Sequence, residues 1–547
     1  MRGPNTMRLI TRMASAATLL LLGAAGCSDL EVTNPNDPDR AKALATAGDV
    51  ESLIAGSYNA WFNGNFGTNT FGLAKASFES SATAANFGNL EVSGIPRQAL
   101  PNNASYAELG TVIERMWVRS YRALAAVGDG ARTLDEKPEL AAELGAQREA
   151  RVRTWGKFVQ ALSHATLALF YDQAFLLDET IDISQPQTPV PSDQVATRAY
   201  ALFDEAIAGA TGASWVIPAS WIGTQADVSA AQIAELAHSY RALFRASMPR
   251  LSSDAVDWGA VIADLDNGLT SDFMIYPDYQ SGEFYDAAFD YGGGSNGWAA
   301  DTYFIIGMAD QSGRYQDWLS MPVADRLPYF GATSADQPFI IETPDTRFPE
   351  GTTLAAQIAN PGEYYVIPTE DTWDYSYSEH MTLAGRGTWR WSYYYYPSSF
   401  DYWFSTNFDV ALIKFDELNL LRAEALLATG DAPGAAAIVD VTRTAHGLDA
   451  SGDGNAACVP MLPDGSCGDL MEMLKWEKRL ETRGQGALFR ISWYWDARRW
   501  GDHYLGTPLQ FPIPVSDLQT LQMPSYTFGG AQSFGAPVSS YAWPGEN

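Results

Sequence analysis

The chain has 547 residues, and its 65 Asp and Glu residues outnumber its 35 Lys and Arg residues, which gives a formal net charge of −30 at pH 7. So acidic a protein repels nucleic acid, and no run of Lys and Arg supplies a local basic patch, so we expect no nucleic-acid partner. Apolar residues make up 46% of the chain, which is enough to bury a large core.

Residues 1–26 have the pattern of an export signal that ends at a lipid attachment point. Arg2, Arg8 and Arg12 precede an apolar run over residues 16–26, and Cys27 follows directly. A charged start, a short apolar stretch and small residues before a cleavage point are typical of a signal peptide, and this stretch is too short to span a bilayer. We therefore expect cleavage before Cys27 and a lipid on its thiol. The alternative is an ordinary secreted protein in which Cys27 is incidental.

Helical periodicity dominates both ends of the remaining chain. Apolar residues recur at a helical spacing over residues 49–62, 109–134, 149–170, 192–210, 230–246, 258–268, 410–427, 432–446 and 470–483. The predicted helices come in pairs. In the clearest pair Gly430 lies in the turn, and Ala435, Ala436 and Ala437 allow two helices to approach closely, a pattern that resembles a tetratricopeptide unit. The sequence therefore predicts an all-α scaffold with several tetratricopeptide-like units.

The middle of the chain has a different character. Over residues 276–408 helical periodicity fades, and Gly, Pro, Ser and aromatic residues dominate. We divide the mature chain into an N-terminal helical part at 27–275, an irregular ligand-binding insertion at 276–408 and a C-terminal part at 409–547. Loops that are held on a rigid scaffold commonly carry binding residues.

Aromatic residues are densest between positions 389 and 404, where ten of sixteen residues are aromatic. Sugar rings stack their flat C–H faces on aromatic rings, and their hydroxyls need hydrogen bonds from neighbouring polar groups. In an extended segment, the side chains at 389, 391, 393 and 395 share one face. The candidate ligand-binding residues are Trp389, Arg390, Trp391, Tyr393, Tyr395, Trp298, Trp318 and Trp373. The alternative is a pair of core strands followed by an apolar loop.

Two later features concern cysteine and calcium. Cys458 and Cys467 flank a turn-rich segment, and in an oxidising compartment we expect a local disulfide. A transition-metal site would need two further ligands, and we assign none.

Residues 449–455 place oxygen-bearing side chains at alternate positions, as calcium loops do, but Pro460 stands where the closing glutamate belongs. We expect no cofactor, with calcium as the open alternative.

Paired carboxylates raise the possibility of a glycoside hydrolase, because that reaction uses two acids about 5 to 10 Å apart. Glu477 and Glu481 have helical spacing, and Glu417 and Glu424 lie seven residues apart. Lys and Arg residues alternate with the first pair along one helix, which predicts ion pairs within that helix, and Glu424 lies at a packed crossing. We expect structural roles for these acids, and no catalysis.

Several segments, in this order, resemble motifs of the SusD/RagB family. They are DVALIKFDELNLLRAEA at 409–425 followed by Gly430 and Asp431, EKRLE at 477–481, DARRWG at 496–501 and FPIP at 511–514. Residues 156–176 and 325–330 resemble earlier motifs of the family. No single motif is decisive, and the resemblance rests on their common order along nearly the whole chain.

The resemblance implies a fold and a function. The implied fold is an all-α scaffold of four tetratricopeptide-like units with a long, irregular, aromatic-rich insertion that forms most of the ligand face. The implied protein is a lipoprotein on the outer face of the outer membrane that captures oligosaccharides and hands them to a TonB-dependent transporter. An oligopeptide-binding member of the family is the alternative ligand class, and a surface glycoside hydrolase or a purely structural lipoprotein are alternatives of other classes.

Overall fold

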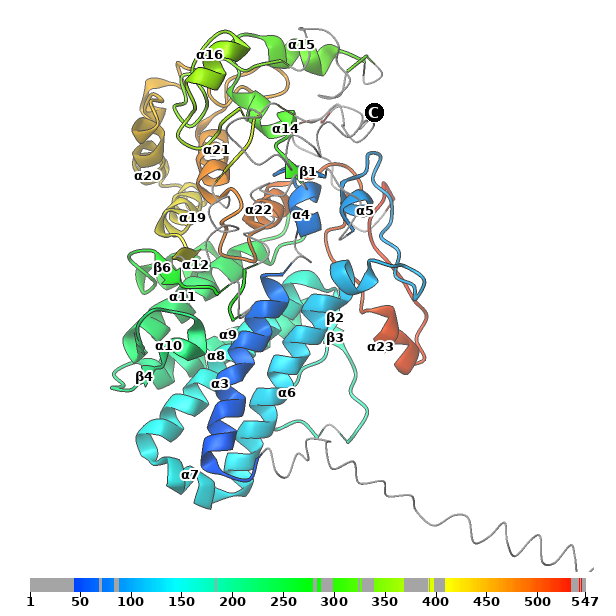
Figure 1. Ribbon diagram of the computed structural model, residues 1–547, viewed down its shortest axis with the longest axis vertical. Coiled ribbons are helices and arrows are strands. Elements are labelled where there is room, and N and C mark those ends of the chain that lie inside the picture. Colours follow the sequence, from blue (N-terminus) through cyan, green and yellow to red (C-terminus); the bar gives the residue numbers. More distant parts are fainter. Residues whose placement is uncertain are drawn as a thin grey trace, which may run out of the picture.

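The computed structural model describes residues 44–67, 71–82, 88–182, 184–278, 283–286, 299–322, 325–326, 339–367, 392, 394–397, 409–532, 541 and 543. These residues form an elongated, mainly helical molecule (Figure 1). Cys27 and the predicted signal peptide lie outside the described residues. None of the helices among the described residues is both long and apolar enough to span a bilayer.

Six helices form the N-terminal scaffold, in the middle and lower parts of Figure 1. They are α3 (Ala47–Asn65), α6 (Arg115–Glu136), α8 (Ala146–Phe170), α9 (Ser192–Ala210), α11 (Ala230–Ser247) and α12 (Trp258–Asp266). Helix α3 packs against α6, α8 against α9, and α11 against α12. The structure therefore confirms the predicted all-α scaffold of paired helices.

Local sequence explains where two of these helices begin. Thr46 accepts a hydrogen bond from the backbone N–H of Asp49, whose carboxylate accepts one from the N–H of Thr46, so the pair caps α3 in both directions. Ser229 and Gln232 do the same for α11. Gly130 lets α3 and α6 approach closely, because a Cβ at this position would lie 2.5 Å from Cγ1 of Ile54.

The C-terminal part contains a second set of helices. They are α19 (Phe415–Ala428), α20 (Ala432–Ala445), α21 (Leu470–Thr482), α22 (Ser492–Trp500) and α23 (Val515–Thr520). Gly430 has a φ of 95° in the turn between α19 and α20, a conformation that side chains rarely adopt. Asp431 then caps α20 by accepting a hydrogen bond from the N–H of Gly434. The predicted pair of helices around Gly430 is thus present.

One predicted boundary is wrong. The helix expected over residues 410–427 begins at Phe415, because the preceding segment is strand β8 (Val410–Ile413), which pairs antiparallel with β6 (Phe273–Ile275). Three other two-residue pairs are β1 (Ser81–Ala82) with β7 (Ala299–Ala300), β2 (Gln173–Ala174) with β3 (Val190–Pro191), and β4 (Val216–Ile217) with β5 (Val228–Ser229). Pairing to a distant strand overrides the local helical pattern in β8.

Short helices complete the described part of the chain. Alongside the scaffold lie α4 (Phe71–Ala76), α5 (Asn89–Ser93), α7 (Pro138–Leu144) and α10 (Ala219–Ile222). The irregular region contributes α14 (Tyr303–Ile306), α15 (Arg314–Ser320) and α16 (Leu354–Ala359), at the top of Figure 1. The first hydrophobic core extends from the N-terminal scaffold to residues of the C-terminal part such as Leu418, Trp495 and Phe511. A second core joins the irregular region to Trp476 of α21 and Trp493 of α22, and a smaller one lies between α19, α20 and α21.

Cys458 and Cys467 are joined by a disulfide bond in the segment between α20 and α21. The neighbouring candidate calcium loop is organised by protein contacts. The side-chain oxygen of Asn455 accepts hydrogen bonds from Arg443 and from the N–H of Val459, and its amide donates to the carbonyl of Gly468. Across the described ranges, no three His, Cys, Asp or Glu residues gather in an arrangement that could hold a metal ion.

Candidate functional site

The candidate site is the aromatic segment around residues 389–396, and the structure describes its C-terminal half. Residues 392 and 394–397 are described, whereas six of the candidate ligand-binding residues lie outside the described residues: Trp298, Trp373, Trp389, Arg390, Trp391 and Tyr393. Two candidates, Trp318 and Tyr395, are described. The structure therefore reports how the aromatic segment is held to the scaffold.

Trp318 is a core residue, which corrects the expectation that its ring faces a ligand. It is 4% exposed. Its ring centroid lies 5.5 Å from that of Tyr303 and 6.1 Å from that of Tyr315, and the guanidinium of Arg326 lies 4.6 Å from it. Neighbours therefore surround the indole, and no free face remains for a sugar.

Tyr395 is also buried, at 3% exposure, and the expectation for its side chain is corrected in the same way. Its N–H donates to the carbonyl of Val366 and its carbonyl accepts from the N–H of Val366, each over 2.9 Å. Tyr394 and Tyr396 are buried as well. The alternation expected for an extended segment therefore leaves no exposed face at these three tyrosines.

Contacts of four described residues, Ser392 and Tyr394 to Tyr396, hold this part of the segment in place. Ser392 donates to the carbonyl of Asp301 from both its N–H and its hydroxyl. The hydroxyl of Tyr394 donates to Gln357 over 2.6 Å, and Tyr395 bridges Val366. The hydroxyl of Tyr396 accepts from Nε2 of Gln485 over 3.0 Å. The described residues of the segment are thus fixed to the rest of the protein by several hydrogen bonds.

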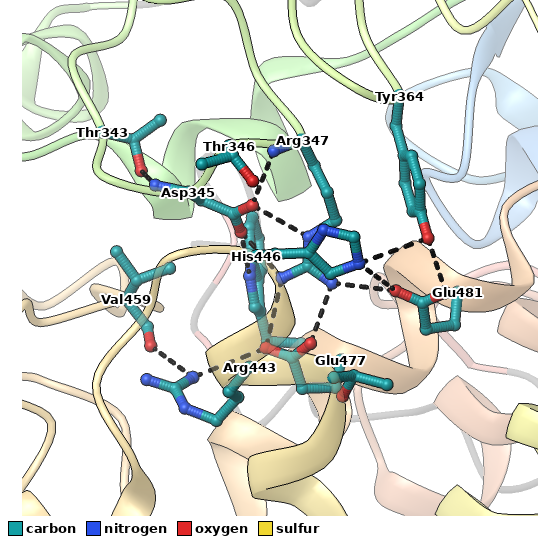
Figure 2. A network of polar contacts seen from close by, with 12 residues as sticks. Thr343, Asp345, Thr346, Arg347, Tyr364, Arg443, His446, Val459, Glu477 and Glu481 are labelled. Carbon is teal, nitrogen blue, oxygen red and sulfur yellow. Dashed lines mark hydrogen bonds and ion pairs between the residues drawn. The ribbon is translucent and has the colours of Figure 1, made fainter.

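A buried ionic network holds the irregular region against α21 (Figure 2). Arg347 is fully buried, and its guanidinium donates to both carboxylate oxygens of Asp345 and of Glu477 over 2.8 to 3.2 Å. It also donates to Glu481 over 3.2 Å. Trp476 donates its indole N–H to Asp345 over 3.0 Å. One arginine therefore joins a loop of the irregular region to successive turns of α21.

A second group of side chains extends this network toward solvent. Tyr364 donates its hydroxyl to Glu481 over 2.7 Å. Nε2 of His446 lies 3.4 Å from Glu481, and its Nδ1 lies 2.6 Å from the exposed carboxylate of Glu363. Arg443 lies 3.6 Å from Glu477 and donates to the carbonyl of Val459. In Figure 2, Tyr364 of the irregular region, Arg443 and His446 at the end of α20, and the two glutamates of α21 lie together.

The network shifts the ionisation of its members. Burial alone raises the pKa of Glu481, but the hydrogen bond from His446 and the charge of Arg347 outweigh it and lower the pKa to about 2. Burial lowers the pKa of His446, but hydrogen bonds to Glu481 and Glu363 outweigh burial and raise it. Glu481 is therefore held ionised at neutral pH, and the network favours the cationic form of His446.

These shifts predict a pH dependence. Because the pKa of Glu481 is depressed from 4.5 to about 2, its stabilising contribution is present above pH 4.5 and is lost as the pH falls toward 2. Because the pKa of His446 is raised above 6.5, its contribution is present below pH 6.5 and is lost as the pH rises through the raised value. We expect Glu481→Gln to lower the free energy of unfolding by about 3 kcal/mol near neutral pH and by progressively less as the pH falls from 4.5 toward 2.

Urea unfolding at a series of pH values measures this effect. Glu363→Gln is the matched control, since Glu363 shares the His446 contact but is half-exposed, and its loss is expected to be small at every pH. A Glu481→Gln deficit that stays constant between neutral and acidic pH would contradict the depressed pKa.

In the described structure, all four acids considered for hydrolysis make hydrogen bonds or ion pairs with other protein groups. Glu477 and Glu481 bind Arg347, Arg443, His446 and Tyr364, so their partners come from other segments and not, as expected, from their own helix. Glu424 receives two hydrogen bonds from Arg499 over 2.7 Å, and Glu417 accepts from the N–H of Ala487 and from Ser492. Each carboxylate thus has a structural role.

The described residues define a class of protein: a scaffold of paired helices that holds an irregular, aromatic-rich region by buried ionic contacts. Among solved structures, this fold is similar to that of a SusD superfamily protein from Bacteroides vulgatus ATCC 8482, with a TM-score of 0.51 at 13% identity over 90% of this chain and 96% of that one. It is also similar to a SusD homolog from Parabacteroides distasonis ATCC 8503, with a TM-score of 0.54 at 13% identity over 90% and 99% of the two chains.

A SusD/RagB family protein from Bacteroides thetaiotaomicron VPI-5482 gives a TM-score of 0.50 at 14% identity, with 86% of this chain and 94% of that chain covered. No protein-family model and no curated protein matches the sequence. The structural matches cover most of each chain. The protein therefore has the SusD-like fold that its sequence motifs resemble.

Proposed function

We propose that the protein is a surface-exposed binding lipoprotein that captures oligosaccharides and hands them to a TonB-dependent outer-membrane transporter. The observation that carries this proposal is the SusD-like fold, which extends over 90% of the chain in two of the structural matches. The lipid on Cys27 tethers the protein to the outer membrane, with the binding face toward the exterior. The paired helices supply the surface that contacts the transporter.

The anchored aromatic segment supports an oligosaccharide as the ligand. Trp389, Trp391 and Tyr393 alternate with Arg390 and Ser392, so apolar rings and hydrogen-bonding groups occur side by side in the sequence. Sugar binding needs both kinds of group. The contacts of Ser392 and the three buried tyrosines fix the backbone next to the candidate rings, which reduces the entropy lost when a ligand binds.

Two alternative functions are an oligopeptide-binding protein and a surface glycoside hydrolase. An oligopeptide is the second ligand class, because tryptophan and tyrosine also stack on apolar peptide side chains. A surface glycoside hydrolase needs two available carboxylates. In the described structure, protein groups donate hydrogen bonds to Glu417, Glu424, Glu477 and Glu481. These contacts argue against the hydrolase function.

Tryptophan replacement tests the proposal. Trp389→Ala and Trp391→Ala are each expected to weaken oligosaccharide binding by about tenfold, because each removes one stacking ring. The control is Trp221→Ala, which removes a half-buried tryptophan from α10 on the helical scaffold and is expected to leave affinity unchanged. Isothermal titration calorimetry measures all three. Unchanged affinity in both Trp389→Ala and Trp391→Ala would contradict the assigned ligand face.

A further inference from the structure

A concave site lies on the helical scaffold, and none of its described lining residues belongs to the aromatic segment. It has a volume of about 610 Å³ and lies between the first turns of α6, the segment after α8 and α23, which is the isolated helix at the lower right of Figure 1. Pockets of about 300 to 1,000 Å³ accommodate small organic ligands. The described lining residues are Trp117, Val118, Tyr121, Phe175, Leu176, Leu177, Gln185, Gln187, Asp517, Thr520 and Leu521.

Three aromatic side chains form one wall of this scaffold cavity. The ring centroid of Trp117 lies 4.8 Å from that of Tyr121 and 6.0 Å from that of Phe175. The hydroxyl of Tyr121 donates to the carbonyl of Phe175 over 3.0 Å and accepts from its N–H over 2.6 Å. Since that hydroxyl is already used, Tyr121 offers the cavity its ring. Val118, at the rim, is 47% exposed.

One carboxylate gives the scaffold cavity its charge. Among the described lining residues, Asp517 is the only Asp, Glu, Lys, Arg or His. Burial raises the pKa of the Asp517 carboxyl, a hydrogen bond from Trp117 opposes that change, and nearby Glu114 raises the pKa further. In the described part of the chain, no ion pair joins Asp517 or Glu114 to a basic residue. The cavity is therefore apolar on one wall and negative at one point.

Asp517 differs in this respect from three other partly buried acids of the scaffold. Asp178 pairs with Arg198, Glu179 with Lys157, and Asp264 with Arg241. Each of those carboxylates has its charge balanced within the protein. Asp517 has a hydrogen bond from Trp117 but no basic partner among the described residues, and burying a carboxylate without a balancing charge is unfavourable.

We propose that the scaffold cavity binds a small organic cation, namely a primary ammonium group on an apolar or aromatic body. The ammonium pairs with Asp517, and the apolar body packs against Trp117, Tyr121 and Phe175. A cation beside these rings gains a further attraction from their negative faces. Gln185, Gln187 and Thr520 also line the cavity, and their side-chain oxygens can accept hydrogen bonds from a ligand. This site is separate from the aromatic segment, so the inference does not depend on the proposed oligosaccharide function.

Saturation-transfer NMR with two matched probes tests the inference. At neutral pH, 2-phenylethylammonium is expected to bind with a dissociation constant of about 1 mM, as ligands of this size commonly do. The neutral 2-phenylethanol, of the same shape, is expected to bind at least about tenfold more weakly, because it lacks the charge that Asp517 balances. Equal binding of the two probes, or binding of neither, would overturn the inference.

A pair of variants assigns the effect to Asp517. Asp517→Asn is expected to weaken 2-phenylethylammonium binding by about tenfold and to leave 2-phenylethanol binding unchanged. Glu136→Gln, which removes an exposed acid at the other end of α6, is expected to change neither. If Asp517→Asn does not fold, the wild-type protein provides the second measurement. Acidification that protonates Asp517 should release the ammonium probe but not the alcohol, and equal release of both would refute the assignment.

Discussion

Arg347→Met is expected to lower the free energy of unfolding by about 3 to 5 kcal/mol, because it leaves buried carboxylates without their cation. Asp345 and Glu477 are fully buried beside Arg347, and Glu481 is 3% exposed at its side chain. Methionine fills much of the same volume, so the loss reports charge and hydrogen bonding more than packing. Urea unfolding followed by far-ultraviolet circular dichroism measures the change.

The matched control for Arg347 is Arg314→Met, in the same irregular region. Arg314 pairs with Glu342 over 2.8 Å, but the two side chains are 40% and 31% exposed. Exposed ion pairs contribute less than about 1 kcal/mol. Equal losses for the two variants would show that the Arg347 network does not hold the irregular region to α21.

Glu424→Ala is expected to destabilise the C-terminal helices by a similar amount, about 3 to 5 kcal/mol. Glu424 of α19 accepts two hydrogen bonds from Arg499 and one from the indole N–H of Trp500, each over 2.7 to 2.8 Å. Lys478 of α21 lies 3.8 Å from the same carboxylate. Removing Glu424 leaves these buried donors without their acceptor. The midpoint and slope of urea unfolding give the free-energy change.

Arg422→Ala is the control for Glu424, since it lies on the same helix and loses an ion pair to Asp266 over 2.7 Å. Both members of that pair are partly exposed, so the expected loss is below about 1 kcal/mol. Glu424→Gln keeps an acceptor for Trp500, so its loss of unfolding free energy should lie between those of Glu424→Ala and Arg422→Ala. A loss in Glu424→Ala as small as that of Arg422→Ala would contradict a structural role for this acid.

Helices could be predicted from the sequence where the helical spacing of apolar residues alone determines the local structure. The expected helix over residues 192–210 has the bounds of α9, because its buried residues recur at a helical spacing along a single face. The expected start at residue 49 falls in the first turn of α3, which begins at Ala47. Strand β8 was missed because its hydrogen bonds go to β6, more than a hundred residues earlier.

The ionic network could be predicted only in part. The sequence of α21 shows alternating acids and bases, and structural roles for Glu477 and Glu481 follow from that pattern. Their main partner, Arg347, lies 130 and 134 residues away, and its loop has no repeating pattern that would announce it. The spacing of charged residues along a helix predicts only contacts within that helix. The intrahelical ion pairs expected for these acids were therefore predicted in place of the contacts that they make with other segments.

The candidate ligand face shows a different limit. Aromatic density predicts both a core and a sugar-binding surface, because the same rings serve either purpose. Trp318 and Tyr395 belong to the core, as their burial shows. No sequence signal separated them from Trp389 and Trp391, for which ligand binding stays a prediction.

The central claim is that a SusD-like scaffold binds oligosaccharides without cleaving them. Its most direct test is calorimetric titration of the purified mature protein with a panel of oligosaccharides, with released reducing ends assayed in the same samples. The account predicts saturable binding of at least one oligosaccharide and no release of reducing ends. Hydrolysis of any bound oligosaccharide, or binding confined to peptides in a parallel peptide panel, would contradict it.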